Sequence, residues 1–158
     1  MTLEVTQEKV IAAYKGGDEE SKKLLETLFG KDKVSPKITD RVKTFEDACD
    51  VLGIPQEINL PDVTDCEDED AKAITAFAKL SIIRKALNEG WNPDYANNNQ
   101  AKYYPWFKWN SGSGFSFYGD GYDGAGSLVG ARLSFKSAKL AKYAGEQFID
   151  LYRDFLTL

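Results

Sequence analysis

The stretch Asn97–Gly119, NNNQAKYYPWFKWNSGSGFSFYG, decides the fold that the sequence predicts for this chain. After a polar turn signal come two runs rich in strand-forming aromatic residues, Lys102–Trp109 and Phe115–Tyr118. The Ser-Gly-Ser-Gly sequence between the runs is typical of a hairpin loop. We therefore predict an antiparallel hairpin here. A third strand is expected at Leu128–Phe135, after a flexible glycine-rich loop, Gly119–Gly126.

Helical spacing of apolar residues predicts helices on both sides of this hairpin. In the N-terminal half, N-cap residues and glycine stops delimit short helices at about residues 6–16, 18–30 and 44–52. A longer helix, Asp70–Asn88, has a wide apolar stripe and is expected to be central. Ser137 caps a final helix that continues to the chain end. The predicted fold class is α+β, with N-terminal helices, a three-stranded antiparallel meander and a C-terminal helix packed on it.

The composition indicates one ordinary globular domain. The chain has 158 residues, of which 42% are hydrophobic and 28% charged. We expect a single domain over residues 1–158, with a helical part to about residue 90 and the aromatic sheet plus C-terminal helix beyond it. No apolar run approaches the roughly 18 residues that a membrane helix needs, and the N-terminus lacks a secretion signal. We therefore expect a cytoplasmic protein with no membrane partner.

The residue types exclude several kinds of chemistry. The chain contains no histidine, which rules out Ser-His and Cys-His nucleophiles and histidine general bases. Cys49 and Cys66 are too few for a zinc site. Asp120 and Asp123 lack the spacing of a calcium loop, and the acidic run Asp65–Asp70 is typical of a solvated helix start. The glycines match neither of the phosphate-binding motifs G-x-G-x-x-G and G-x-x-x-x-G-K-[ST]. We predict a protein that is not an enzyme and that uses no cofactor and no metal.

More than half of the aromatic residues lie between Trp91 and Tyr122, which indicates either a compact aromatic core or an exposed platform. Strand alternation divides them between two faces of the sheet. The face toward the helices is expected to hold Phe107, Trp109, Phe115, Phe117, Leu133 and Phe135. The opposite face is expected to hold Tyr104, Trp106, Lys108, Tyr118 and Arg132. Tyrosine and tryptophan beside basic residues resemble a binding hot spot or a stacking platform. The alternative is that another part of the chain covers this face.

Pro105 lies inside the first predicted strand. Because proline has no backbone N–H, this strand belongs at a sheet edge or contains a bulge. An edge strand can accept a strand from a partner or from a second copy of the chain, unless Lys102 and Lys108 protect the edge.

Four segments of the chain resemble small uncharacterised proteins of phages, prophages and mobile elements of gut bacteria. They are KITDRVKTFEDAC, ALNEGWNPDYANNNQAKYYPWF, GFSFYGDGYD and VGARLSFKSAKLAKYAGEQFIDLYRDFL. The W-x-P-D and F-K-S-x-x-L-A-x-Y pieces are the most specific. The resemblance implies an origin and no activity. It implies a small accessory protein that acts by binding, in the cytoplasm of a bacterial host or on a virion.

These observations favour a binding protein that acts through its aromatic sheet face on a protein partner or on a second copy of itself. The candidate binding residues are Trp91, Tyr95, Tyr104, Trp106, Tyr118 and Arg132. One alternative is single-stranded nucleic-acid binding, in which the basic residues follow the backbone. Those residues are Arg132, Lys136, Lys139 and Lys142. The net charge of −5 argues against this alternative. The other alternative is carbohydrate binding, with Asp94 and Asn97, Asn98 and Asn99 as hydrogen-bond partners.

Overall fold

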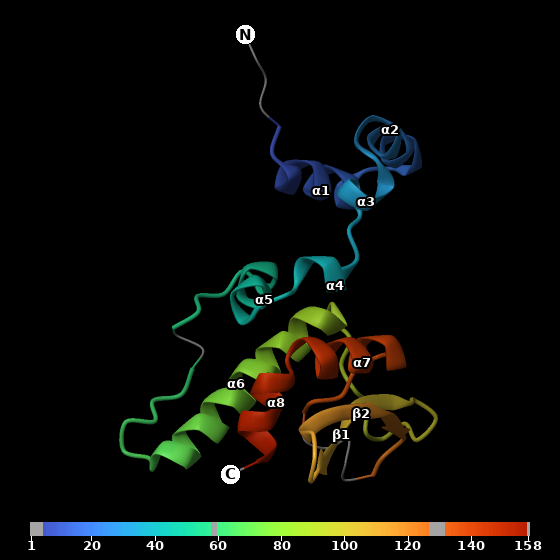
Figure 1. Ribbon diagram of the computed structural model, residues 1–158. Coiled ribbons are helices and arrows are strands. Elements are labelled where there is room, and N and C mark those ends of the chain that lie inside the picture. The colour runs from blue at the N-terminus through green and yellow to red at the C-terminus, as the bar shows by residue number, and fades with distance from the viewer. Residues whose placement is uncertain (1–4, 58–59, 127–131, 158) are drawn as a thin grey trace. The chain divides into compact units, whose positions relative to one another are not determined.

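The computed structural model in Figure 1 describes residues 5–57, 60–126 and 132–157. The chain divides into two compact units, Met1–Arg41 and Val42–Leu158. Each unit has its own helices and its own buried residues, and each is described by itself below. The expectation of one domain over the whole chain stays a prediction.

The first unit consists of helices. They are α1 (Gln7–Gly16), α2 (Glu19–Phe29), α3 (Lys31–Val34) and α4 (Ile38–Arg41). Asp18 caps α2 by accepting a hydrogen bond from the backbone N–H of Ser21 at 2.9 Å, and Gly30 ends it with a φ of 85°. The sequence prediction missed α3 and α4, because helices of four residues are too short to show a periodic pattern.

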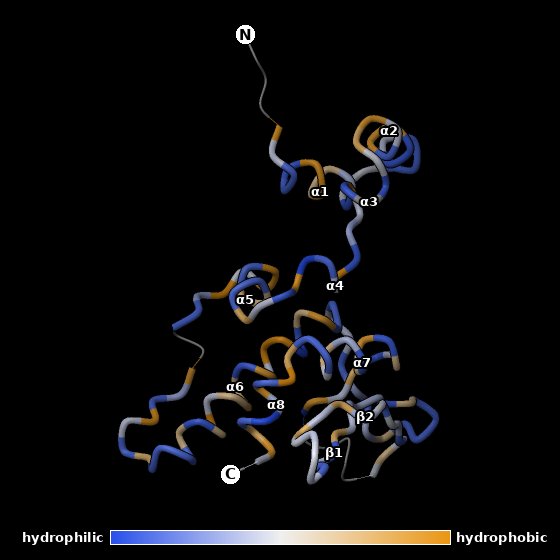
Figure 2. The backbone as a smooth tube through the Cα atoms, viewed as in Figure 1, coloured by the Kyte–Doolittle hydropathy of each residue, from blue (hydrophilic) through white to orange (hydrophobic). Residues whose placement is uncertain are grey.

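The second unit is built around a long helix, α6 (Asp68–Asn88). This helix packs against α5 (Phe45–Leu52), α7 (Ala138–Gln147) and α8 (Ile149–Leu156), which confirms its predicted central position. Figure 2 shows both hydrophobic and hydrophilic residues along the length of α6, and its buried residues lie between Ala76 and Asn88. Its C-terminal half supplies much of the core through Leu80, Ile83 and Leu87.

The predicted capping box of α5 is present. The hydroxyl of Thr44 accepts a hydrogen bond from the Asp47 backbone N–H at 3.1 Å, and the Asp47 carboxylate accepts one from the Thr44 N–H at 2.9 Å. Gly53 ends the helix in the left-handed conformation, with a φ of 65°. These local signals place α5 within one residue of its predicted bounds.

The sheet is an antiparallel hairpin of β1 (Lys102–Asn110) and β2 (Gly114–Asp123), as predicted. Strand β2 is longer than expected, since Gly119–Asp123 belongs to the strand and not to a flexible loop. Tyr104 is the partner of Gly121 in the ladder, and its ring lies so close that a Cβ on this glycine would be 2.7 Å from it. The aromatic ring covers the glycine backbone, which explains why a glycine-rich sequence forms a strand here.

The predicted third strand is not present as a strand in the described part of the sheet, which contains β1 and β2. Residues 128–131 of that prediction lie outside the described residues. Phe135 makes one isolated bridge to Tyr103, with N–H···O distances of 2.7 and 3.0 Å. The preceding carbonyl, that of Ser134, accepts hydrogen bonds from Arg84 and Asn88 of α6. The Ser134 carbonyl therefore bonds to side chains of α6 and not to a neighbouring strand.

The C-terminal helix packs on the sheet as predicted, and Ser137 caps it through the Leu140 N–H at 3.4 Å. Gly145 makes the close approach possible, because a Cβ there would lie 2.6 Å from the ring of Phe117. The prediction of one continuous helix is wrong. Phe148, with φ −113° and ψ 31°, separates α7 from α8 and is buried. At this break the ring of Phe148 lies edge-on to that of Tyr143, with 6.3 Å between the ring centroids.

Within residues 5–57, 60–126 and 132–157, no helix combines the length and the apolar character that crossing a membrane requires.

Candidate functional site

The hairpin has one aromatic face packed on the helices. The ring of Phe107 stacks on Phe115 at 4.9 Å and contacts Tyr152 of α8 at 4.8 Å between ring centroids. Phe117 lies edge-on to Phe107 at 6.0 Å. Leu133 and Phe135 are buried as expected. This face needs no functional explanation, because aromatic packing of this kind stabilises the fold.

Trp109 was expected on the same packed face, and this expectation is wrong: 67% of its surface is exposed. Its ladder partner is Phe115, and the next pair, Asn110 with Gly114, closes the hairpin. The described helices do not cover the side chain at this position. Trp109 therefore joins the exposed aromatic residues of the hairpin.

The opposite face of the hairpin carries the aromatic residues that the sequence predicts there. Trp106 is 49% exposed and Tyr118 is 63% exposed. Tyr104 is half-buried, because its ring lies over Gly121. A bulge between Trp106 and Phe107 in the ladder leaves Tyr118 without a Cα partner. The alternative that the chain itself covers this face does not hold for Trp106 and Tyr118.

Lys108 lies on this face above the ring of Tyr118, with its Nζ 3.2 Å from the ring centroid. Its hydrogen bond and its charge lower the pKa of the Tyr118 phenol. The ammonium fixes the position of an otherwise exposed ring, which reduces the conformational entropy that the ring would lose on binding.

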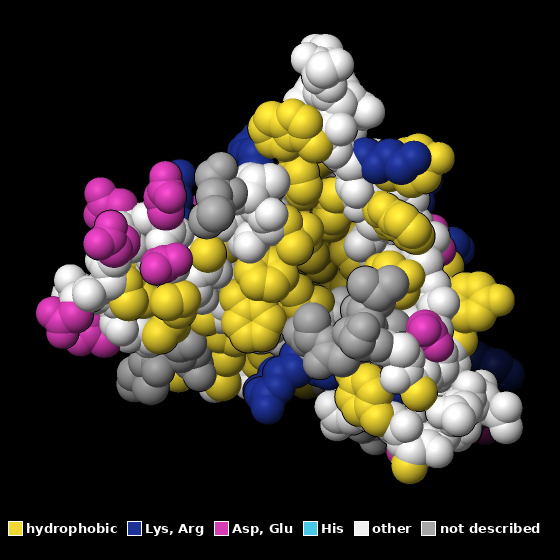
Figure 3. Space-filling model, turned by 90° about the horizontal axis from the view of Figure 1, so that it is seen from below, with side chains coloured by type: hydrophobic (Ala, Val, Ile, Leu, Met, Phe, Trp, Pro, Cys, Tyr) yellow, Lys and Arg dark blue, Asp and Glu magenta, His cyan; other side chains and the backbone are white. Residues whose placement is uncertain are grey.

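A groove of about 660 Å³ runs along β1, between this strand and the C-terminal end of α8. Its walls are mainly apolar. From the strand come Trp106, Phe107 and Trp109, among others, and from the helix come Tyr152, Phe155 and Leu156. Figure 3 views the side of the molecule on which the C-terminus lies and shows hydrophobic side chains gathered in a hollow. Sequence reasoning missed this groove, because it depends on where α8 ends beside β1.

The outer edge of β1 is unpaired over part of its length. The backbone of Tyr103 bonds to Phe135 on the side away from β2. Since backbone groups alternate along a strand, those of Phe107 and Trp109 point to the same side. No described strand pairs with them there. Pro105, which has no N–H, lies on β1 between Tyr103 and Phe107. The prediction that its strand is at a sheet edge is confirmed.

The two lysines expected to protect this edge differ. Lys108 is exposed, as an edge-protecting residue should be. Lys102 is completely buried, so that expectation is wrong. Its Nζ donates hydrogen bonds to the carbonyls of Asn97, Gln100 and Gly124 at 3.2, 3.0 and 2.6 Å. This lysine holds two loops together and does not face a partner.

The remaining candidate residues lie away from the groove lining. Tyr95 is 41% exposed, and its ring centroid is 5.4 Å from the Lys102 Nζ. Arg132 is exposed and has a φ of 60°. Trp91 is half-buried just beyond the end of α6. Of the six candidate residues, Tyr104 and Trp106 therefore line the groove and Tyr118 lies beside Lys108 of its lining, while Trp91, Tyr95 and Arg132 are not part of it.

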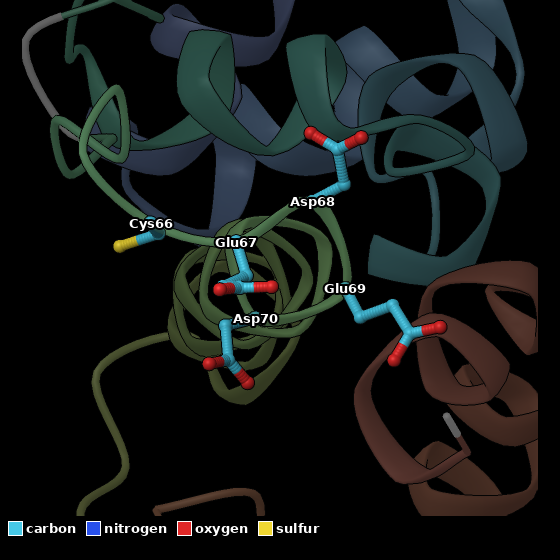
Figure 4. Close-up of a pocket in the computed structure, with 5 residues that line it drawn as sticks. All are labelled: Cys66, Glu67, Asp68, Glu69 and Asp70. Atoms are coloured by element: carbon cyan, nitrogen blue, oxygen red, sulfur yellow. The ribbon is translucent and has the colours of Figure 1, made fainter.

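The acidic run forms a separate cavity of about 690 Å³ at the start of α6, lined by Cys66 and Glu67–Asp70. Figure 4 shows that these side chains radiate from the helix start and do not converge. Carboxylates at the start of a helix interact favourably with the positive end of the helix dipole. Because these do not converge, they form neither a shared metal site nor an acid–base pair. The described residues contain no group of three or more potential metal ligands.

The Asp123 carboxylate in the glycine-rich segment accepts a hydrogen bond from the Ala125 N–H, two residues on, at 3.2 Å. The backbone N–H groups of Ala125, Gly126 and Gly124 and the charge of Lys102 lower the pKa of the Asp123 carboxyl, while partial burial opposes them. This carboxylate therefore has a structural role that accounts for its position.

Comparisons with protein-family models, with curated proteins and with solved structures find no match to this chain.

Proposed function

We propose that this protein is a non-enzymatic binding protein that holds a protein partner against its aromatic hairpin. The observation that carries the proposal is the set of exposed aromatic side chains beside an apolar groove. Trp106 and Trp109, which line the groove, are 49% and 67% exposed, and Tyr118, beside Lys108 on the hairpin, is 63% exposed. Large aromatic residues that remain exposed next to an apolar hollow are typical of interaction sites.

The edge of β1 suggests how a partner would be held. Phe107 and Trp109 offer backbone donors and acceptors to an extended segment, and the groove offers pockets for its alternate side chains. Pro105 limits such pairing to the half of the strand nearer the hairpin tip. A second copy of the chain could supply this segment as well as another protein could.

Two rival functions have less support. Of the basic residues that would follow a nucleic-acid backbone, Lys136 pairs with Glu89 at 3.0 Å and Lys142 pairs with Glu146 at 3.8 Å. Carbohydrate binding would need the polar residues of the loop after α6. The Asp94 carboxylate accepts from the Ala96 N–H at 2.9 Å, and the Asn97 side chain accepts from the Asn99 N–H at 3.0 Å. These groups are already engaged within the loop.

The resemblance to phage and mobile-element proteins sets the context of the same proposal. On this reading the partner belongs to a bacterial host or to a virion, and the protein acts in the host cytoplasm or on the particle. The four resembling segments are what supports this part.

The test is a comparison of two baits in affinity capture from the native host, quantified by mass spectrometry. The first bait is the whole chain and the second carries Trp106→Ala together with Trp109→Ala. Removing a binding hot spot weakens affinity by roughly 30-fold or more, so we expect the main partner to be lost from the second bait. Ile74→Ala removes a 40% exposed apolar side chain from α6 and serves as the control.

Equal capture by the wild-type and double-variant baits would sink the site assignment. Once a partner is captured, hydrogen exchange tests the mode of binding. Strand addition predicts slower exchange at the amides of Phe107 and Trp109 in the complex, whereas binding through side chains alone leaves these rates unchanged.

A further inference from the structure

Arg84, in the last turns of α6, is a buried cation without a counter-charge among the residues that the structure describes. Only 8% of its surface is exposed. Its Nε donates a hydrogen bond to the Ser134 carbonyl at 3.3 Å. Within the part of the chain that the structure describes, Nη1 and Nη2 have no acceptor, and Arg84 forms no ion pair. Burying a guanidinium costs free energy unless acceptors replace the lost water, so this arrangement needs an explanation.

A second guanidinium lies near it. Arg132 precedes Ser134 by two residues and, like Arg84, has no ion pair among the described residues. Burial lowers the pKa of Arg84, Tyr95 opposes this effect, and the charge of Arg132 lowers the pKa further. The backbone of Arg132 has a φ of 60°, in a region that residues other than glycine rarely adopt. The hydrogen bond from Arg84 to Ser134 thus brings a segment with a second positive charge to α6, and Arg132 in that segment has a backbone conformation that is rare for residues other than glycine.

The neighbouring polar groups do not neutralise this pair. The Asn88 side chain is fully used, since it donates to the Ser134 carbonyl at 2.9 Å and accepts from the Lys136 N–H at 3.0 Å. Glu89 is paired with Lys136. Residues 127–131, which precede Arg132 in the chain, have the sequence SLVGA and include no acidic side chain.

A buried hydroxyl lies in the same segment. The Oγ of Ser134 is buried and has no hydrogen-bond partner among the described residues. Buried polar groups are almost always satisfied in folded proteins. Among the described residues, neither Arg84 nor Arg132 has a carboxylate partner, and the Ser134 hydroxyl beside them is unsatisfied. An anion bound in this region would give these groups the partners that the described residues do not.

We propose that Arg84 and Arg132 bind an oxyanion, carried by a carboxylate or a phosphate group, between their guanidinium groups. The planar fork of a guanidinium matches two oxygens of either group, and the anion supplies a counter-charge that the described residues do not. Leu133 lines the groove beside β1, whereas Arg84, Arg132 and Ser134 do not, and this inference does not depend on the proposed function.

The test uses the whole ¹⁵N-labelled chain and two probes, inorganic phosphate and acetate, each titrated at constant ionic strength maintained with chloride. The arginine Nε–H signals and the backbone amides of Arg132 and Ser134 are followed by NMR. We expect these signals to shift and saturate with at least one probe. Saturation with phosphate alone, with acetate alone or with both identifies the source of the oxyanion, and saturation with neither overturns the proposal.

Arg132→Ala is the decisive variant, because this side chain is exposed and its removal leaves the core intact. The loss of a charge-assisted hydrogen-bonding group should weaken the affinity by about tenfold or more. Lys85→Ala removes an exposed positive charge from the next position of α6 and should leave the affinity unchanged. Equal affinity in wild type and Arg132→Ala, or an equal loss in both variants, would show that the anion binds elsewhere or only through general charge.

Arg84→Lys gives a second measurement on the buried side. It keeps the positive charge but loses the fork, so the affinity should fall while the backbone spectrum away from the site stays that of the wild type. If this variant does not fold, the Arg132→Ala series decides the question by itself.

Discussion

Lys102 is the residue whose role differs most from its sequence pattern. In a strand rich in aromatic residues it reads as an exposed, edge-protecting lysine, yet it is completely buried. Its ammonium donates to three backbone carbonyls, two in the loop before β1 and one in the turn after β2. A buried charge is tolerated when hydrogen bonds replace its water, and three acceptors match the three N–H groups of a lysine.

Replacing Lys102 with methionine should destabilise the protein by about 2–4 kcal/mol, because three carbonyls lose their common donor. The measurement is urea denaturation of the whole chain followed by circular dichroism. Lys139→Met, at an exposed position of α7, is the matched control and should change the midpoint little. Equal midpoints for the two variants would contradict the structural role of Lys102.

At the scale of elements, the hairpin depends on how aromatic residues and glycines pair across its strands. Trp106 is paired with Gly119, and Tyr104 is paired with Gly121. The two glycines differ in their surroundings. A Cβ on Gly121 would lie 2.7 Å from the Tyr104 ring, while a Cβ on Gly119 would meet no atom within 4 Å. Only one of the two positions therefore requires glycine for space.

Gly121→Ala should destabilise the protein by about 1–3 kcal/mol, since the Tyr104 ring must move away from the strand. Gly119→Ala should be neutral or stabilising by up to about 1 kcal/mol, because it restricts the unfolded chain without a clash. Thermal unfolding of the two variants measures the difference. The same loss of stability in both would mean that the pairing of Tyr104 with Gly121 does not hold the hairpin.

At the scale of the whole molecule, the two units differ in how much they bury. The unit Val42–Leu158 contains α5 to α8 and the hairpin, with most of the buried apolar residues among those described. In the unit Met1–Arg41, the described buried apolar residues are Val10, Val34 and Ile38. A chain segment of about 40 residues rarely folds alone without disulfides or metals.

We therefore expect a fragment of residues 42–158 to fold cooperatively by itself, and a fragment of residues 1–41 to have little stable structure. Circular dichroism and NMR dispersion of the two purified fragments check this expectation. A 42–158 fragment without a cooperative unfolding transition would contradict it, because its helices and hairpin already bury a common core.

Much of the secondary structure was predictable because its signals are local. The capping box at Thr44, the caps at Asp18 and Ser137 and the glycine stops act within a few residues, and each lies where the pattern indicates. Alternation with a period of two likewise predicts that Phe107 packs on the helices and that Trp106 lies on the opposite face. Whether that face is covered could not be predicted, and the structure shows Trp106 exposed. The exposure of Trp109 was not predictable in this way, since alternation does not reveal how far the helices cover a strand.

The sequence by itself determined the α+β class, the hairpin and the aromatic division between its faces, because propensity, capping and periodicity act along the chain. Only the tertiary structure decided the groove between β1 and α8, the break at Phe148 and the meeting of Arg84 with the segment of Arg132 and Ser134. Arg84 and Ser134 are 50 residues apart in the chain. Contacts across such a separation follow from the packing of whole elements, and no local pattern encodes them.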